Sequence, residues 1–223
     1  MIRLNDIYTS IQGEGAHTGV PMIVVRTQGC GVGCPFCDTK ETWASAPEGF
    51  RVEYLEGLRS DERHWADVPV ATAVEWIKSV AEKRIRHILL TGGEPLEQPG
   101  STLLAYELSK AGFDVHLETS GTTPDEDLRP FEWVTVSPKL NMPGGRKVIP
   151  AQVRLADEVK WVVGKQADLD VLRAFIGEHR LNPECVWLQP MSQSRAATEL
   201  CVASCLSNGY RLSLQMHKYI GVE

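Results

Sequence analysis

Three cysteines, Cys30, Cys34 and Cys37, lie within eight residues of a 223-residue chain that contains six cysteines in all. Glycines at positions 29, 31 and 33 surround them and allow a tight loop whose backbone amides can be oriented freely. Thiolates are the usual ligands of iron–sulfur clusters, and simple electron carriers use four of them. With three thiolates, a cluster would keep one iron without a protein ligand, so the pattern predicts an open site that binds a further molecule.

Three other interpretations of this cysteine group remain open at the level of sequence. A zinc site fits the Cys-x3-Cys spacing, although none of the six histidines has another histidine three to five positions away. A carrier or sensor cluster with a distant fourth cysteine, or buried thiols without a metal, would also produce the pattern. The other cysteines fit a protein core, with Cys201 and Cys205 on one helix and Cys185 in a strand.

Short apolar runs alternate with amphipathic stretches along most of the chain. The stretches predict helices at residues 70–84, 101–111, 167–178 and 198–208. The apolar runs predict strands at residues 23–26, 87–90, 114–117, 133–136, 159–163, 186–189 and 211–214. Alternation of this kind is typical of βα units, and about six units are fewer than the eight of a full barrel. We therefore expect an α/β fold with a parallel sheet that forms an open, partial (β/α) barrel.

One segment departs from this alternation. Residues 48–67 are rich in charge and show no clean period, and we interpret them as part of an insertion at about residues 44–69. The sequence shows neither an internal repeat nor an interdomain linker. Residues 1–223 are therefore expected to form one core domain that carries this insertion.

Polar motifs follow five of the predicted strands. Each begins where its strand ends: Thr91-Gly-Gly-Glu-Pro95, Glu118-Thr-Ser-Gly121, Ser137-Pro-Lys139, Gln189-Pro-Met-Ser192 and Gln215-Met-His-Lys218. Any one of them could be a plain turn, because glycine, proline, serine and threonine favour turns. Ligands of parallel α/β folds bind at the carboxyl ends of the strands. Five such motifs at the same edge therefore predict a binding site there.

Composition and charge narrow the classes of function. Hydrophobic residues make up 43% and charged residues 23% of the chain, as in ordinary globular proteins. The net charge of −6 disfavours a protein that grips nucleic acid. No apolar run approaches the roughly 18 residues of a membrane helix. We expect a cytoplasmic protein that binds neither nucleic acid nor membrane.

The cysteine spacing resembles that of the radical S-adenosylmethionine (SAM) enzymes. Gly92-Gly93-Glu94 likewise resembles the motif by which these enzymes hold the SAM amino group. A more specific set of motifs, spread from residue 5 to the end, resembles the 7-carboxy-7-deazaguanine synthases: Ile11-Gln-Gly-Glu-Gly15, Arg26, Cys37-Asp-Thr39, Thr91-Gly-Gly-Glu-Pro95, Ser137-Pro-Lys139, Gln189-Pro-Met191 and His217-Lys-Tyr219.

This resemblance implies a fold, a reaction and partners. The implied fold is an abbreviated radical SAM partial barrel in a homodimer. The implied reaction is the conversion of 6-carboxy-5,6,7,8-tetrahydropterin to 7-carboxy-7-deazaguanine with loss of ammonia, on the route to queuosine. The resemblance also implies a [4Fe–4S] cluster, SAM and Mg²⁺ as cofactors, and flavodoxin or ferredoxin as the reductant.

The resemblance further implies a role for individual residues. Cys30, Cys34 and Cys37 would hold the cluster and Thr39 the Mg²⁺, while the radical derived from SAM, not a side chain, would do the chemistry. SAM would contact Phe36, Cys37, Asp38, Gly93, Ser137, Pro138, Lys139, Gln189, Pro190, Met191 and Ser192. The substrate would contact Ile11, Gln12, Gly13, Glu14, Arg26, Thr91, His217 and Glu223. Arg26 in particular offers a forked donor suited to the substrate carboxylate.

Glu223 is a departure from the family, whose chains usually finish on a small or apolar residue. We expect the backbone terminus to contact the pterin and the Glu223 side chain to point outward, since a second carboxylate would repel that of the substrate. Two rival functions remain at this stage. One is an activase of glycyl-radical enzymes, which shares the cysteine spacing, and the other is a non-enzymatic iron–sulfur sensor.

Overall fold

The computed structural model describes residues 1–48, 51–52, 55, 58, 64–82, 84–124 and 127–222. Its strands are β1 (Ile2–Ile11), β2 (Pro21–Thr27), β3 (Ala66–Val68), β4 (His87–Gly92), β5 (Asp114–Thr119), β6 (Trp133–Val136), β7 (Glu158–Val163), β8 (Val186–Pro190) and β9 (Arg211–Leu212). Its α-helices are α1 (Val70–Val80), α2 (Ser101–Lys110), α3 (Pro150–Arg154), α4 (Gln166–His179), α5 (Arg195–Asn208) and α6 (Met216–Ile220). Short 3₁₀ helices are η1 (Gly15–His17), η2 (Lys40–Thr42), η4 (Pro95–Glu97), η5 (Pro183–Cys185) and η6 (Met191–Gln193).

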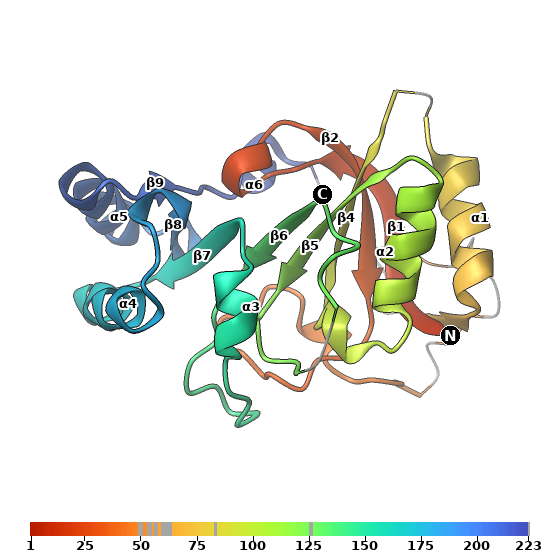
Figure 1. Cartoon of the computed structure of the whole chain (residues 1–223), viewed down its shortest axis with the longest axis horizontal. Coiled ribbons are helices and arrows are strands. Elements are labelled where there is room, and N and C mark those ends of the chain that lie inside the picture. Colours follow the sequence, from red (N-terminus) through yellow and green to blue (C-terminus); the bar gives the residue numbers. More distant parts are fainter. Residues whose placement is uncertain are drawn as a thin grey trace.

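All nine strands belong to one sheet in the order β3-β1-β2-β4-β5-β6-β7-β8-β9. Strands β2 and β4 to β9 pair in parallel, while β1 and β3 are antiparallel to their neighbours. In Figure 1 the strands curve past one another, with α1 and α2 at one end of the sheet and α4 and α5 at the other. The sheet does not close, which confirms the predicted α/β partial barrel.

Strand β1 is absent from the sequence prediction, and so is edge strand β3, which lies inside the predicted insertion. β3 pairs with β1 through Ile2–Val68 and Leu4–Ala66, and Val52 N donates to Trp65 O over 2.9 Å just before it. The described end of the insertion is therefore part of the sheet. The prediction for Cys185 is also wrong, because this half-buried residue ends η5, one position before β8 begins.

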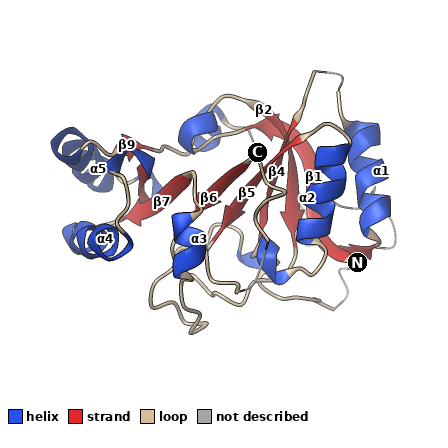
Figure 2. Cartoon of the chain, viewed as in Figure 1, coloured by secondary structure: helices blue, strands red, loops and turns tan. Residues whose placement is uncertain are grey.

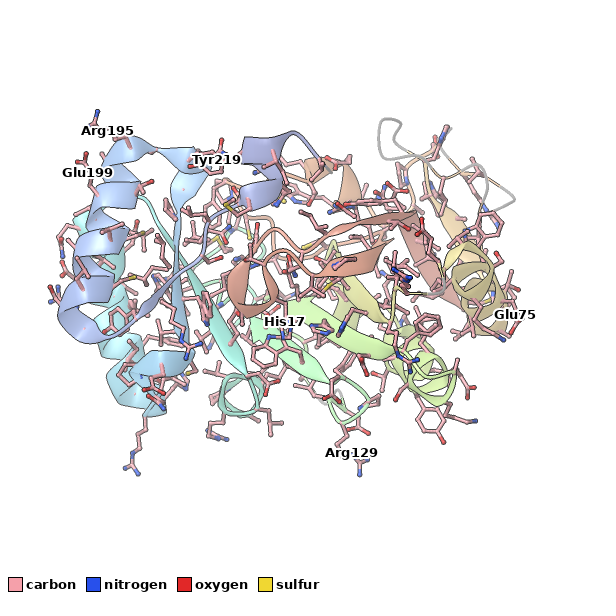
Figure 3. All side chains as sticks on the ribbon, turned by 90° about the horizontal axis from the view of Figure 1, so that it is seen from above. His17, Glu75, Arg129, Arg195, Glu199 and Tyr219 are labelled. Atoms are coloured by element: carbon pink, nitrogen blue, oxygen red, sulfur yellow. The ribbon has the colours of Figure 1, made fainter. Side chains whose placement is uncertain are left out.

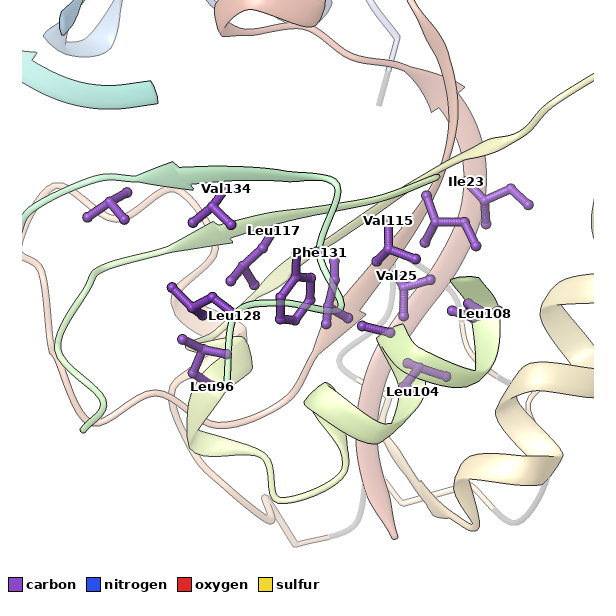
Figure 4. Packing of buried hydrophobic residues seen from close by; sticks show 14 of the residues in the cluster. Ile23, Val25, Leu96, Leu104, Leu108, Val115, Leu117, Leu128, Phe131 and Val134 are labelled. Atoms are coloured by element: carbon purple, nitrogen blue, oxygen red, sulfur yellow. The ribbon is translucent and has the colours of Figure 1, made fainter. Parts of the chain in front are cut away.

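The parallel strands bury side chains on both faces. The outer face carries aliphatic residues such as Ile23 and Val25 of β2 and Val115 and Leu117 of β5, which pack against helices (Figure 4). Leu104 and Leu108 of α2 are fully buried in the same core. Figure 2 shows that the longer helices lie outside the curved sheet. Apolar packing therefore fixes the outer face and leaves alternate residues of each strand facing the barrel interior.

The loop between β1 and β2 crosses to the far strands of the barrel. Gly15 N donates to Ser213 Oγ over 3.0 Å, and Ala16 N donates to Glu158 Oε2 over 2.9 Å. His17, labelled in Figure 3, packs edge-on against His116 and Trp133, with ring centroids 4.4 and 4.6 Å away. The loop thereby ties the first hairpin to β7 and to the chain after β9.

Other charged side chains lie at the periphery, where they pair with near neighbours in the sequence. Figure 3 shows Glu75, Arg129 and Arg195 pointing away from the barrel, and their side chains are 72%, 90% and 91% exposed. Among the described residues, no helix has the length and apolar character to cross a membrane.

Candidate active site

One cavity of about 500 Å³ opens at the carboxyl edge of the parallel strands. The five motifs predicted for this edge all contribute to its wall, as does the cysteine loop after β2. Of the predicted site residues, those that line the cavity are Ile11, Gln12, Gly13, Glu14, Arg26, Cys30, Cys34, Phe36, Cys37, Asp38, Thr39, Thr91, Gly93, Ser137, Lys139, Gln189, Pro190, Met191, Ser192 and His217. Pro138 is not among the lining residues, and Glu223 lies outside the described residues.

Backbone hydrogen bonds hold the cysteine loop in place. Cys30 N donates to Trp43 O over 3.1 Å, and Cys37 N donates to Cys34 O over 2.9 Å. On the other side, Gly144 packs so closely that a Cβ there would overlap the carbonyl oxygen of Gly31. Cys30, Cys34 and Cys37 all line the cavity. These contacts fix the loop so that its three thiols line the same cavity.

The three thiols fit an iron–sulfur cluster better than a single metal ion. Within the described residues, no group of three His, Cys, Asp or Glu side chains is placed to hold a single ion. In a [4Fe–4S] cluster each thiolate binds a different iron, so its ligands are spaced more widely. Burial raises the pKa of the Cys30 thiol to about 11, and a bound metal supplies the positive charge that favours the thiolate.

The strand end after β4 joins the cysteine loop to β5. A Cβ on Gly93 would overlap the Gly29 carbonyl, so the two loops are in direct contact. The Glu94 carboxylate is buried and accepts hydrogen bonds from Thr119 Oγ1 at 2.6 Å and from Ser120 N at 2.8 Å. Burial raises the pKa of Glu94. The Thr91–Pro95 motif therefore contacts the cysteine loop through Gly93 and the end of β5 through Glu94, and so fixes their relative position.

Arg26, at the end of β2, presents a guanidinium to the cavity. Its Nη2 donates to Tyr8 Oη over 2.8 Å. No described carboxylate lies within ion-pair distance of this guanidinium, unlike that of Arg146, which pairs with Glu97 at 3.2 Å. Arg26 therefore keeps donors for an anionic ligand.

The residues after β6 place a second cation near the cysteines. Lys139 Nζ donates to Ser137 Oγ over 2.5 Å and lies 5.7 Å from the centroid of the Phe36 ring. Burial lowers the pKa of Lys139, although the Cys34 thiolate would favour its charge. Thr39, the predicted Mg²⁺ ligand, has its Oγ1 3.6 Å from Cys37 Sγ. Hard oxygen donors thus lie beside the thiols.

Helix α6 and the residue before it form another wall. Asp38 accepts hydrogen bonds from Lys218 Nζ at 2.7 Å and from Gln215 Nε2 at 3.1 Å. Burial alone would raise the pKa of Asp38, but the hydrogen bond and charge of Lys218 lower it. His217 lines the cavity beside them, and burial lowers its pKa.

Sequence reasoning missed several residues of the cavity. Lys160 of β7 lies inside the barrel between the carboxylates of Glu14 and Glu118, and Tyr8 comes from the unpredicted strand β1. A signal for Lys160 was available, since a lysine in the middle of an apolar strand needs a partner. Further lining residues that lie outside the predicted motifs are Asn5, Val24, Glu41, Trp43, Leu89 and Val162.

Comparison with known proteins agrees with this geometry. The family model of the Radical SAM superfamily matches residues 24–136, which contain the cysteine loop and the Thr91–Pro95 motif. The 7-carboxy-7-deazaguanine synthase of Escherichia coli strain K12 is 40% identical over 98% of both chains. That of Buchnera aphidicola is 34% identical over 98% of both chains, and that of Synechocystis is 32% identical over 97% of this chain and 91% of its own. The chain belongs to the 7-carboxy-7-deazaguanine synthase family.

A solved structure supports the same family at the level of the fold. The crystal structure of QueE from Escherichia coli superposes with a TM-score of 0.86 at 37% sequence identity, covering 97% of this chain and 94% of that one. As a radical SAM member of the synthase family, the chain uses a [4Fe–4S] cluster and SAM, with Mg²⁺. The family assignment does not favour an activase or an iron–sulfur sensor.

Proposed function

We propose that the chain converts 6-carboxy-5,6,7,8-tetrahydropterin to 7-carboxy-7-deazaguanine with loss of ammonia, a reaction of deazapurine and queuosine biosynthesis. One observation carries this proposal. Three thiols and the Arg26 guanidinium line the same cavity as the ion pair between Lys160 and Glu118. A cavity of about 500 Å³ suits a small molecule and a cofactor, as enzyme pockets do. An activase would instead need access for a protein segment.

The cofactor roles proposed for the residues follow their positions. Cys30, Cys34 and Cys37 would bind the cluster, and Thr39 would contribute an oxygen to Mg²⁺. When bound, the cluster and SAM supply a primary alkyl radical that takes hydrogen from the substrate. The proposed SAM contacts are Phe36, Cys37, Asp38, Gly93, Ser137, Pro138, Lys139, Gln189, Pro190, Met191 and Ser192.

The proposed substrate residues bind and orient the pterin. Arg26 would form a forked pair with the substrate carboxylate, because its donors are not taken by a described carboxylate. The other proposed contacts are Ile11, Gln12, Gly13, Glu14, Thr91, His217 and Glu223. Because a primary alkyl radical attacks most C–H bonds, these residues must also hold one substrate carbon in contact and keep other C–H groups away from the radical.

The proposal extends to partners and organisation. We propose flavodoxin or ferredoxin as the electron donor, a second copy of the chain as the partner in a homodimer, and a cytoplasmic location. All six cysteines are free thiols, as is usual in a reducing compartment. Residues 1–223 would form one core domain, with residues 44–69 as its insertion.

Anaerobic turnover tests this function directly. The reconstituted protein is incubated with SAM, dithionite, Mg²⁺ and the carboxytetrahydropterin, and the products are separated by liquid chromatography with mass detection. We expect 7-carboxy-7-deazaguanine and ammonia with SAM regenerated, and no product from the Cys34→Ala variant. Cleavage of SAM without a deazaguanine product from the native protein would contradict the proposed substrate.

A further inference from the structure

Lys160 is a buried cation inside the barrel, and it lies far from the cysteine loop in the sequence. It lies in β7 between Val159 and Trp161, which face the outer core, so its own side chain faces the interior. The Lys160 side chain is 7% exposed. An ammonium group in such a place is retained only when it is paired.

Two carboxylates pair with Lys160. Its Nζ contacts the Glu14 carboxylate and lies 3.2 Å from Glu118 Oε1. Burial alone would lower the pKa of Lys160, but Glu118 and Glu14 raise it. Burial would likewise raise the pKa of Glu14, yet Lys160 lowers it. The Lys160 ammonium and the Glu14 carboxylate therefore hold each other in the charged form.

The two carboxylates differ in how far they are satisfied. Glu14 Oε1 accepts from Gln215 Nε2 at 2.9 Å, in addition to the contact of Glu14 Oε2 with Lys160. Glu118 receives longer bonds, 3.4 Å from Gln12 Nε2 and 3.4 Å from Thr91 Oγ1. The Glu118 side chain is 21% exposed and lines the cavity. Glu14 Oε1 also lies 3.4 Å from Gln189 Nε2, so each carboxylate has three polar partners among the described residues. Glu118 has the longer bonds and the more exposed side chain, which makes it the better placed of the two to accept from a ligand.

A pterin offers the complementary chemistry. The pyrimidine half of its ring carries an amino group next to a ring N–H. These two groups donate in parallel, so a carboxylate can accept one hydrogen bond with each of its oxygens. Arg26 lines the same cavity and suits the carboxylate at the other end of the substrate. The cavity wall thus carries one group that suits the anionic part of the ligand and another that suits its N–H donors.

We propose that Lys160 is a positioning residue, which holds Glu118 in place as an acceptor for the N–H groups of the pterin ring. Glu14, the second ion-pair partner of Lys160, holds the ammonium group from the other side. This inference rests on the proposed function. Lys160 also lines the cavity, but the role proposed for it is exerted through Glu118. It acts by fixing the direction of the Glu118 oxygens and by preventing Glu118 from turning away.

The test measures ligand binding apart from turnover. The probe is 6-carboxypterin, a stable aromatic relative of the substrate, titrated by fluorescence into reconstituted, SAM-loaded enzyme. We expect Lys160→Met to weaken 6-carboxypterin binding by about 10-fold or more, and Lys160→Arg to recover most of the affinity. Lys110→Met is the matched control, because that lysine lies 59% exposed on α2. Iron content and SAM affinity report whether each variant has folded.

The pH dependence adds a readout that mere packing would not move. In Lys160→Met, Glu14 loses its ammonium partner, so its pKa should rise and binding should weaken further between about pH 7.5 and pH 6. The native enzyme should show a smaller change over this range. The titratable groups that face Lys160, Glu14 or Glu118 from the packed elements are Glu158 of β7, Lys139 after β6 and His217 of α6.

Each outcome decides the proposal. Equal probe affinity and pH profile in Lys160→Met and the native enzyme would overturn it. If Lys160→Met fails to retain iron, Glu118→Gln decides, because it keeps the shape of the side chain; its affinity should fall by about 10-fold, and an unchanged affinity overturns the inference. Failure of the native enzyme itself to turn over the carboxytetrahydropterin would instead contradict the proposed function.

Discussion

Gly13 and His217 pack so closely that a Cβ on Gly13 would overlap the imidazole ring. The Gly13 carbonyl also accepts a hydrogen bond from Met216 N at 2.8 Å. The loop after β1 and helix α6 therefore meet through both backbone and side chain. Since Gly13 and His217 both line the cavity, this contact sets the shape of the wall proposed to receive the pterin.

Replacing Gly13 by alanine should push His217 away and deform this wall. We expect Gly13→Ala to lower the free energy of unfolding by about 1–3 kcal/mol, as overpacking does, and to raise the KM for the substrate. Urea unfolding and steady-state kinetics measure the two effects. Gly177→Ala is the control, because Gly177 lies in α4 with no atom within 4 Å of an added Cβ, and it should gain up to about 1 kcal/mol. Unchanged KM and stability in Gly13→Ala would contradict the tight contact.

Removal of one cavity thiol should release the cluster. Cys34→Ala is expected to lose most of its iron and acid-labile sulfide, because two thiolates hold a cluster poorly. Cys201 is fully buried in the apolar core, so Cys201→Ala should keep its iron while losing about 1–2 kcal/mol of stability. Iron analysis and the visible absorption spectrum distinguish the variants, and full iron retention in Cys34→Ala would refute this ligand set.

Loss of the Thr39 hydroxyl should weaken the response to Mg²⁺. We expect Thr39→Val to need about 10-fold or more Mg²⁺ for half-maximal rate, and Thr39→Ser to restore the native response, since the effect comes from one oxygen ligand. Turnover is measured over a series of Mg²⁺ concentrations. Thr72→Ala, on the exposed face of α1, serves as the control. Identical Mg²⁺ curves for Thr39→Val and the native enzyme would exclude this role.

The buried His116 should make folding sensitive to mild acid. His116 is 3% exposed, and burial, followed by the neighbouring His17 and His87, lowers its pKa from 6.5 to about 4. Between pH 6.5 and about pH 4, His116 is protonated in the unfolded chain and neutral in the folded chain. The stability present above pH 6.5 should therefore fall by up to about 1.4 kcal/mol for each pH unit below it.

Urea unfolding at pH 7.5 and pH 5.5 measures this loss. His116→Phe should show a smaller difference between the two pH values, because it removes the group that titrates. His179→Gln, on α4 outside the barrel, should keep the native difference. An equally large difference in His116→Phe would mean that other groups cause the acid sensitivity.

The parallel strands β2 and β4 to β8 could be predicted because their outer faces are apolar and glycine, proline or serine comes soon after them. β1 could not, because a register shift between Leu4 and Asp6 breaks its alternation. The polar side chains of Asn5 and Asp6 consequently lie buried where a simple pattern expects apolar residues. The short strand β3 carries too few residues for any period to show.

Some residues of the candidate site could likewise be predicted from the sequence, and others could not. Cys30, Cys34 and Cys37 are close in sequence, so local spacing was enough to single them out. Lys160 and Glu118 meet only because β5 and β7 curve around a common interior, and that proximity depends on the order of the strands. Local patterns thus predict ligands that share a loop, whereas partners across the barrel require the topology.

The loop that joins Gly15 to Ser213 and Gly13 to Met216 has a consequence for synthesis on the ribosome. The first hairpin leaves the exit tunnel early, but Ser213, one of its partners, lies 198 residues further along the chain and is translated much later. Contacts between such distant parts of a chain are slow to form, and the exposed edges favour aggregation meanwhile. The nascent enzyme can therefore complete its cavity only after Ser213 and Met216 have been translated, so a chain that stops before them leaves the first hairpin without these partners.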